Sequence, residues 1–380
     1  MLAARPFVAL PTPWEQAHPA AAAWLDALSD AELAALESAQ GWSHAPEPLR
    51  TWAREASELA ALPALPGEPV RLQTRATRRM PGRKVRQVEA FVGVAWSELR
   101  DHAGPLVDWC AGKAHMGRAL AGQLGCALVA VERDADLCAQ GEHAARAAHL
   151  PAEFVVADAL APATWARLSA GAGVVALHAC GALHTTLVRE TRTTRVVLAP
   201  CCYDKALDAS GQAELVSRAA RAALPPLDVE ALRLIHEAPS ETGEGELGRV
   251  RQMQAWRLGL DRWLRDAREA TTYTSLPACP ASWRAMGFEA FCGALLARGG
   301  LPEPRPGEPS LAPFEALGWH ALGRVRRRDV VRGLLRRPTE VALALDRAAG
   351  LAERGYAVQV GTFCSAACTP RNVMITARAR

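Results

Sequence analysis

The chain has 380 residues, of which half are hydrophobic and 22% are charged, a balance typical of a folded globular protein. This length excludes a single small module, and we expect one large domain with an insertion or two unequal domains. The formal charge is only +4, and all but three of the 44 basic residues are arginine, so arginine abundance alone does not indicate nucleic-acid binding. No segment approaches the ~18 uncharged apolar residues of a membrane helix, and the N-terminal sequence has no apolar stretch long enough for export. We therefore expect a soluble cytoplasmic protein, with no membrane partner, whose ten cysteines are free thiols.

The first 60 residues are predicted to form helices. Ser29 and Glu32 have the Ser-x-x-Glu spacing of a capping box, and they precede the periodic apolar run AELAALES. Residues 62–70 contain three prolines and a glycine, which is typical of a linker because proline breaks helices. The predicted N-terminal helical region is therefore 1–70.

Short apolar segments rich in β-branched residues follow, with about 20 residues between neighbours, as expected for buried parallel strands joined by crossover helices. This pattern predicts a doubly wound α/β domain. The five predicted strands are 105–109, 127–131, 153–157, 173–177 and 195–199.

Helical patterns with Pro-rich breaks dominate from residue 208 to residue 335. A helix is predicted at 338–356 with Pro338 in its first turn, and strand patterns follow at 356–363 and 372–379. The sheet is thus predicted to be mainly parallel and seven-stranded, with a helical insertion before its last two strands. The predicted domains are an N-terminal helical region (1–70), a Rossmann-like domain (71–207 and 336–380) and a helical insertion (208–335).

A turn of small residues follows the first predicted strand and opens a helix in the segment VDWCAGKAHMGRAL, residues 107–120. Ligands of open α/β sheets bind outside the carboxyl ends of strands, so a nucleotide-like cofactor is expected here. A P-loop is disfavoured because Arg118 and Ala119 stand where lysine and Ser/Thr are required. A dinucleotide fingerprint is disfavoured because Cys110 occupies its first glycine position. S-adenosylmethionine remains, because it has no phosphate and needs only a tight turn and acidic partners.

Acidic residues stand at the ends of the first three predicted strands: Asp108, Glu132 and Asp158. A carboxylate after the second strand can accept hydrogen bonds from both ribose hydroxyls, which is the role expected of Glu132. Asp158 is expected to receive the adenine amino group, and Asp108 to hold the methionine ammonium. Each could alone be a solvated loop carboxylate, but three in register favour binding.

Two of these acids, Asp108 and Glu132, belong to a set of short motifs spread along the chain. The motifs are MPGRKVRQVE (80–89), Asp108-x-Cys110-Ala111-Gly112-Lys113-x-His115-x-Gly117, VERD (131–134), HACG (178–181), PCCY (200–203) and TPRN (369–372). Together they resemble a class I methyltransferase-domain family with bacterial members and eukaryotic methyltransferase-like proteins, more distantly similar to tRNA 2'-O-methyltransferases. The sequence departs from the family pattern at Ala114, where glycine is usual, and at Gln87, where glutamate is usual. The resemblance implies the class I methyltransferase fold and transfer from S-adenosyl-L-methionine. The predicted cofactor-binding residues are Lys84, Asp108, Cys110, Ala111, Gly112, Lys113, His115, Gly117, Glu132, Arg133, Asp158, Ala159 and His178.

The loops after the fourth and fifth predicted strands are rich in His and Cys, and both are expected at the cofactor edge. The predicted catalytic residues there are His178, Cys180, Cys201, Cys202 and Tyr203.

Four interpretations of these residues compete. The cysteines can pack beside the cofactor while His178 satisfies a backbone group, or His178 or Tyr203 can act as a general base. A cysteine nucleophile that forms an adduct with a pyrimidine is a third interpretation. The fourth is a metal site of the cysteines with Cys364 or Cys368, but the adjacent pair 201–202 does not match the usual Cys-x2–4-Cys spacing of zinc ligands. No metal site is therefore predicted.

Two basic runs flank the predicted catalytic domain. Residues 71–86 contain seven basic residues and no acid, and residues 324–337 contain seven arginines and one aspartate. Each run could be a solvated face of an Arg-rich protein, or it could contact the phosphates of an RNA. We predict methyl transfer from S-adenosyl-L-methionine to RNA, bound through Arg71 to Arg86 and Arg324 to Arg337. The alternatives are a protein or small-molecule acceptor, and a non-catalytic module that binds the cofactor or RNA.

Overall fold

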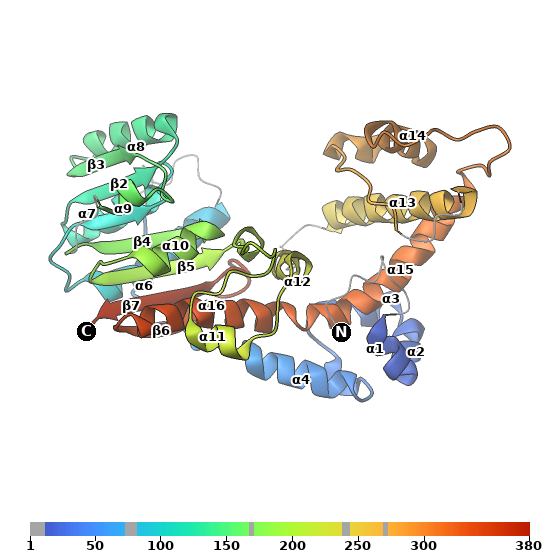
Figure 1. Cartoon of the computed structure of the whole chain (residues 1–380), viewed down its shortest axis with the longest axis horizontal. Helices are drawn as coiled ribbons and strands as arrows, with labels where there is room; N and C mark the ends of the chain where they lie inside the picture. The colour runs from blue at the N-terminus through green and yellow to red at the C-terminus, as the bar shows by residue number, and fades with distance from the viewer. Residues whose placement is uncertain (1–11, 73–81, 167–170, 238–243, 269–272) are drawn as a thin grey trace. The chain divides into compact units, whose positions relative to one another are not determined.

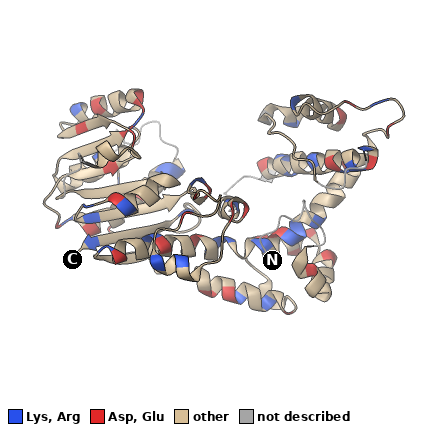
Figure 2. Ribbon diagram, in the orientation of Figure 1, with Lys and Arg blue, Asp and Glu red and all other residues tan. Residues whose placement is uncertain are grey.

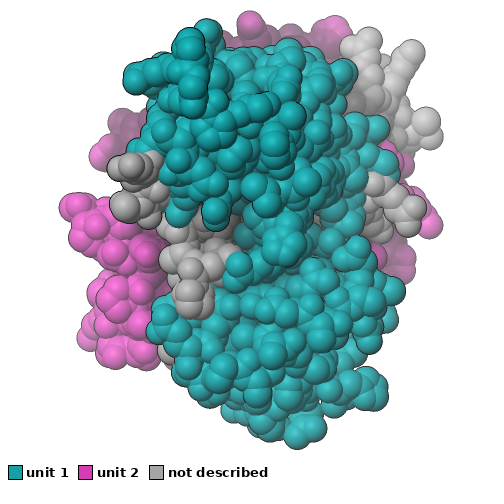
Figure 3. Space-filling model, turned by 90° about the vertical axis from the view of Figure 1, so that its right-hand side faces the viewer, with its two compact units in different colours: residues 1–58, 241–336 teal, residues 59–240, 337–380 magenta. Residues whose placement is uncertain are grey.

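The structure is a computed structural model that describes residues 12–72, 82–166, 171–237, 244–268 and 273–380. The chain forms two compact units and passes between them three times. Unit 1 combines Met1–Glu58 with Glu241–Arg336, and unit 2 combines Leu59–Ser240 with Arg337–Arg380 (Figure 3). Unit 2 thus contains residues 59–70 and 208–240 besides the core of the predicted Rossmann-like region.

Unit 2 is built on a seven-stranded sheet with the strand order β3-β2-β1-β4-β5-β7-β6 (Figure 1). The first five strands run parallel, whereas β7 is antiparallel to both β5 and β6. All seven predicted strands are present within three residues of their expected ends, which confirms the mainly parallel seven-stranded α/β sheet. The strands are β1 (Leu106–Trp109), β2 (Leu128–Glu132), β3 (Ala152–Val156), β4 (Gly173–Cys180), β5 (Arg195–Cys201), β6 (Tyr356–Thr362) and β7 (Val373–Ala379).

The central strands of the sheet are buried on both faces, which explains why they are largely apolar. Along β5, Val196 and Leu198 belong to one core, and Val197 and Ala199 belong to the core on the opposite face. Helices α6 (Gly82–Leu99) and α7 (His115–Leu124) pack on the second of these faces, while α10 (Ala182–Glu190) and α16 (Arg336–Glu353) pack on the first. The other helices of the unit are α8 (Ala135–Ala147), α9 (Pro162–Ala166), η2 (Tyr203–Lys205), α11 (Arg218–Ala223), α12 (Val229–Leu234) and η3 (Ile235–Glu237).

The segment after residue 58 is tied to the end of the chain. The backbone N–H of Leu65 donates to the carbonyl of Thr362 on β6 at 2.9 Å, and Ala64 forms a parallel bridge to the same residue. The predicted linker is therefore attached to the sheet of unit 2.

Unit 1 consists of helices, and the capping box predicted from Ser29 and Glu32 is present at the start of α3. Gly318 of α15 lets that helix approach α13, because a Cβ at this position would lie 2.1 Å from the carbonyl oxygen of Ala255. No helix among the described residues is long and apolar enough to cross a membrane. The helices are α1 (Pro13–Ala17), α2 (Pro19–Ala27), α3 (Asp30–Glu37), η1 (Trp42–His44), α4 (Leu49–Ala60, reaching the boundary), α13 (Glu244–Arg268), η4 (Ala281–Ala285), α14 (Phe288–Arg298) and α15 (Pro313–Gly333).

Candidate functional site

Left-handed backbone conformations gather where β1, β4 and β5 end. Cys110 follows β1 with a φ of 59°, His178 lies near the end of β4 with a φ of 64°, and Cys202 follows β5 with a φ of 50°. Such a conformation costs an L-residue roughly 1–2 kcal/mol, and strained residues cluster at functional sites. The carboxyl-end edge of the sheet is also where open α/β folds bind ligands. This edge is therefore the candidate site.

The turn between β1 and α7 is organised around Asp108. Its side chain is 2% exposed, and its Oδ2 accepts a hydrogen bond from the backbone N–H of Gly117 at 3.0 Å. A Cβ on Gly117 would lie 2.5 Å from that oxygen, so glycine is required for the helix to begin this close to the carboxylate. Burial raises the pKa of Asp108 to about 7, although the Gly117 hydrogen bond acts in the opposite direction. A buried carboxylate with few partners favours a cationic ligand, which would stabilise its charged form.

Glu132 joins the end of β2 to the same turn. Its Oε2 accepts the backbone N–H of Gly112 at 2.9 Å, and its Oε1 accepts those of Arg133 and Asp134 at 2.9 and 3.1 Å. Burial, together with nearby carboxylates, raises the pKa of Cys110 to about 12. The turn therefore carries a protonated thiol and two held carboxylates, by which we mean Asp108 and Glu132, each fixed by hydrogen bonds from backbone N–H groups.

The remaining acid behaves differently. Asp158 is exposed, and its Oδ1 accepts the backbone N–H of Leu160 in its own loop at 2.9 Å. Ala159 beside it is buried, whereas the side chain of Arg133 is exposed. Of the three predicted acids, two contact the β1–α7 turn and the third closes the loop after β3.

His178 lies at an irregularity in the pairing of β4 with β5, and its Nε2 contacts the amide nitrogen of Gln87 on α6. Gln87 Oε1 accepts a hydrogen bond from Lys84 Nζ at 3.2 Å. Because that oxygen serves Lys84, the amide N–H donates to His178 and the imidazole carries its proton on Nδ1. Burial, with the charges of Lys84 and Arg371, lowers the pKa of His178 to about 4. At pH 7, His178 is therefore neutral and offers an N–H donor.

Three of the predicted catalytic residues are brought together as thiols. Cys180 and Cys201 are register partners on β4 and β5, and their Sγ atoms are 3.3 Å apart. With the Sγ of Cys202, all three sulfurs lie within 4.8 Å of one another. We call these residues the thiol cluster.

Tyr203, by contrast, lies in the interior. It is 1% exposed, its ring centroid is 5.1 Å from that of His184, and the guanidinium carbon of Arg347 lies 5.3 Å from its centroid. Burial raises the pKa of its hydroxyl. Tyr203 is thus a protonated core residue beneath the end of β5.

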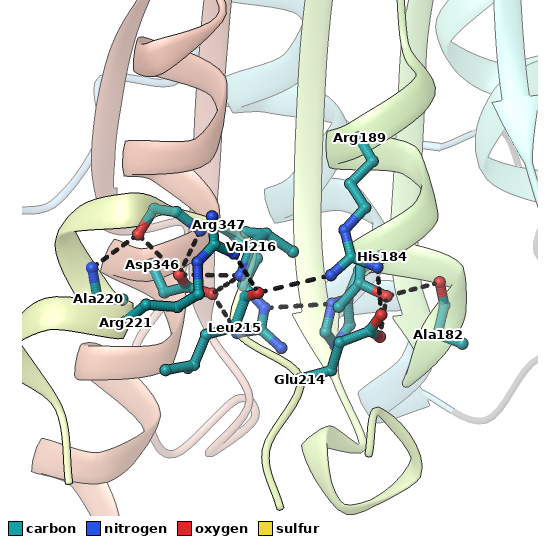
Figure 4. Close-up of polar contacts among 12 residues, drawn as sticks. Ala182, His184, Arg189, Glu214, Leu215, Val216, Ala220, Arg221, Asp346 and Arg347 are labelled. Carbon is teal, nitrogen blue, oxygen red and sulfur yellow. Dashed lines mark hydrogen bonds and ion pairs between the residues drawn. The ribbon is translucent and has the colours of Figure 1, made fainter. Parts of the chain in front are cut away.

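A buried polar network supports this end of the sheet (Figure 4). Asp346 and Arg347 of α16 are fully buried and paired at 2.6 Å. Asp346 accepts hydrogen bonds from the backbone and side chain of Ser217 at 2.9 and 2.8 Å, and Arg347 Nε lies 3.4 Å from His184 Nδ1. His184 in turn lies beside the backbone of Cys201. The network connects α16 to the segment that carries the thiol cluster.

A basic pocket of about 480 Å³ opens beside the β1–α7 turn. Lys113, His115 and Arg118 line it from the turn and from α7, and Gln140 and His143 line it from α8. None of the described residues in its lining is acidic, so the pocket favours an anion. Lys113 and His115, predicted as cofactor-binding residues, are thus placed in this pocket.

The basic run 71–86 is described only in part. Arg83 and Arg86 are exposed on the first turns of α6, and Lys84 between them is half-buried. The side chain of Arg71 is 91% exposed and lies 3.6 Å from a carboxylate oxygen of Glu89. The predicted contacts of Arg75, Arg78 and Arg79 lie outside the described residues.

The basic run 324–337 is largely paired within the chain. Arg328 is 2% exposed and binds the carboxylates of Glu15 and Asp26, and Figure 2 shows acidic and basic residues interspersed along the helices. These ion pairs make much of the run part of the folded structure. Further partners are Glu37 for Arg326, the carbonyl of Leu28 for Arg327, Asp329 for Arg332 and Glu340 for Arg337.

The sequence does not directly indicate the contact between Gln87 and His178, nor the place of Arg118 in the pocket. Gln87 follows Lys84 by three residues, which places both on one face of a helix. This spacing predicts the contact between Lys84 and Gln87, but not the contact of Gln87 with His178. Arg118 stands where a P-loop would have lysine, and that position alone does not indicate a pocket.

Residues 83–208 match the model of a family described as a methyltransferase domain, and no curated protein sequence matches the chain. The matched segment runs from α6 through β5 and η2, and it contains both held carboxylates, His178 and the thiol cluster.

Proposed function

We propose that unit 2 is a class I methyltransferase domain that uses S-adenosyl-L-methionine. The observation that carries this proposal is the match of residues 83–208 to a methyltransferase domain. The geometry supports it, because Asp108 and Glu132 flank one tight turn at the carboxyl ends of β1 and β2. A cofactor with a cationic amino group and ribose hydroxyls needs such an arrangement.

The residues of the edge suit the parts of this cofactor. Asp108 would hold the ammonium group, Glu132 the ribose hydroxyls, and the loop of Asp158 and Ala159 the adenine, while Lys84 would face the carboxylate. The cofactor supplies an electrophilic methyl group on a sulfonium. Its binding would favour the ionised form of Asp108, whose charge is otherwise costly in this buried position.

His178 has a positioning role in this proposal. Because Gln87 occupies its Nε2 and its pKa is lowered to about 4, it does not accept a proton at pH 7. Its Nδ1 is a buried atom without a hydrogen-bond partner, and in this proposal it would donate its N–H to the cofactor or the acceptor when the site is filled. An acceptor that needs no proton removal before transfer, such as a neutral amine, suits this chemistry better than a hydroxyl.

We further propose RNA as the acceptor. Support comes from the exposed Arg83 and Arg86 at the start of α6 and from the basic pocket beside the β1–α7 turn. The run 324–337 contributes less, because at least five of its seven arginines have partners in the chain.

Calorimetry on the full chain tests the cofactor. We expect saturable binding of S-adenosylmethionine and of its demethylated product, and none of NADH. Binding of NADH alone would overturn the proposal.

A tritium methyl-transfer assay on total cellular RNA and protein, beside filter binding of RNA at two salt concentrations, tests the acceptor. Binding that involves phosphates weakens with salt with a log-log slope of roughly 0.7 per contact on single strands. We expect Arg83→Gln with Arg86→Gln to reduce both RNA binding and labelling, and the control pair Arg249→Gln with Arg262→Gln on α13 to leave them unchanged. Label in protein, with RNA binding absent, would replace RNA by a protein acceptor.

A further inference from the structure

The thiol cluster has no task in the proposed methyl transfer. From its geometry we infer that Cys180, Cys201 and Cys202 bind a zinc ion as three thiolate ligands. Zinc–sulfur bonds of about 2.3 Å in a tetrahedral site place the sulfurs roughly 3.8 Å apart. The three sulfurs lie within 4.8 Å of one another, with the closest pair at 3.3 Å, so small side-chain rotations bring them to ligand distances.

The fold overcomes the spacing that argues against zinc in the sequence. Residues 201 and 202 would point to opposite sides of an extended strand, which is why an adjacent pair is a poor zinc motif. Cys202, however, has a φ of 50°, and this left-handed turn interrupts the alternation and returns its sulfur to the side of Cys201. The third sulfur comes from Cys180, the register partner of Cys201 on the neighbouring strand.

The surrounding charges suit a thiolate site. Three thiols that bind Zn²⁺ release three protons and form a centre of net charge −1, with one coordination position left for a ligand from outside the cluster. The ammonium groups of Lys84 and Lys205 lie close enough to interact with the cluster. Thiolates are the form that binds zinc, and nearby cations favour them.

The site is distinct from the other cysteine pair that the sequence offers. Cys364 interacts with Cys368, but neither joins the thiol cluster, and among the described residues that cluster alone groups three such ligands within 4.8 Å. A disulfide between Cys180 and Cys201 would need an oxidant and would draw the sulfurs to about 2.05 Å, leaving Cys202 without a role.

Metal titration of the reduced full chain, without any methyl donor, tests the inference. We expect one Zn²⁺ per chain, measured by competition with a chromophoric chelator, and a thiolate-to-metal charge-transfer band when Co²⁺ replaces it. Cys202→Ser should weaken zinc binding by at least about 100-fold, the upper range for loss of even an outer-shell partner. The matched control Cys126→Ser, a thiol outside the cluster, should bind as the parent does.

Two further variants test the same site in case Cys202→Ser disturbs folding. Cys180→Ser should lose the charge-transfer band while circular dichroism stays unchanged, and Cys364→Ser should keep it. The inference is overturned if the parent binds no zinc after reduction, if Cys202→Ser binds as tightly as Cys126→Ser, or if only Cys364→Ser loses the metal. Because no methyl donor is present, failure here leaves the proposed cofactor binding standing, and the reverse is also true.

Discussion

The two halves of the sheet edge in unit 2 are held in different ways. At β1 and β2, Asp108 and Glu132 are fixed by backbone N–H groups of Gly117 and Gly112, which lie nine and 20 residues away in sequence. At β4 and β5, the supporting groups come from α16, and the contact of Arg347 with His184 spans 163 residues. One half is a local turn, and the other is assembled only when the end of the chain docks.

This difference should separate effects on ligand binding from effects on folding stability. The carboxylates at β1 and β2 accept hydrogen bonds from nearby backbone N–H groups, which are buried at Asp108 and partly exposed at Glu132, so their replacement should alter ligand binding more than folding. The Asp346–Arg347 pair is fully buried, and a buried charge without its partner is strongly destabilising. Mutations in the two halves should therefore separate binding from stability.

The largest effect is expected from Arg347→Met. It leaves Asp346 as an unpaired buried charge, and loss of one partner of such a pair costs about 3–5 kcal/mol. The control is Arg189→Met, which breaks the partly exposed pair of Arg189 with Glu214 and should cost at most about 1 kcal/mol. Urea denaturation, with hydrogen exchange of the β5 segment to report on unit 2, measures both. Equal small losses would show that the β4–β5 half does not depend on α16.

The next largest effect is expected from Asp108→Asn, which should lower cofactor affinity rather than stability. A hydrogen bond to a charged group contributes about 1.5–3 kcal/mol, so affinity for S-adenosylmethionine should fall roughly 10- to 150-fold. Glu132→Gln should lose less, roughly tenfold, because the amide keeps one oxygen that can accept a ribose hydroxyl and no ion pair is lost. Calorimetry with Asp136→Asn, an exposed acid of α8, as control checks this order. An unchanged affinity for Asp108→Asn would remove the carboxylate from the cofactor site.

The pH dependence of cofactor binding sharpens the role of Asp108. Burial raises its pKa to about 7 in the free protein, and only the ionised form pairs with an ammonium group. Affinity should therefore rise between about pH 6 and pH 8 and then level off, whereas Asp108→Asn should not show this rise. Because the folded-state pKa lies above the ordinary value of 3.8, this group makes the unliganded fold less stable as pH rises from about 4 to about 7. Calorimetric titrations and thermal unfolding over this range measure both trends.

The comparison also explains what the sequence could reveal. The strands were predictable from the pattern of apolar residues. The β1–α7 turn was predictable because the residues that form it lie in one short motif. Adjacent Asp346 and Arg347 look like ordinary surface charges of a helix, and only the docking of α16 shows that they are buried. The proximity of the three sulfurs was likewise hidden, because it depends on strand register and on one left-handed residue, Cys202.

The two basic runs also differ in a way that their sequences do not predict. They have similar composition, yet Arg328 of the second run is buried against Glu15 and Asp26, while Arg71 of the first is almost fully exposed. Composition alone does not separate an arginine that stabilises a helix packing from one that is available to a ligand.

The smallest effect is expected from Gln87→Glu, which restores the residue usual in the resembled family. A carboxylate beside His178 would favour the imidazolium, and an opposite charge at this range raises a pKa by roughly 1–3 units. His178 would then titrate at about pH 5 to 7 instead of about 4, so activity at pH 8 should change little. The depressed folded-state pKa of the parent makes its stability fall as pH drops from about 6.5 towards 4, because the unfolded chain binds the proton more readily. Gln87→Glu should reduce this acid sensitivity, as measured by thermal unfolding at several pH values and by the NMR titration of the His178 ring. An unchanged titration would mean that Gln87 of α6 does not control the protonation of the His178 imidazole.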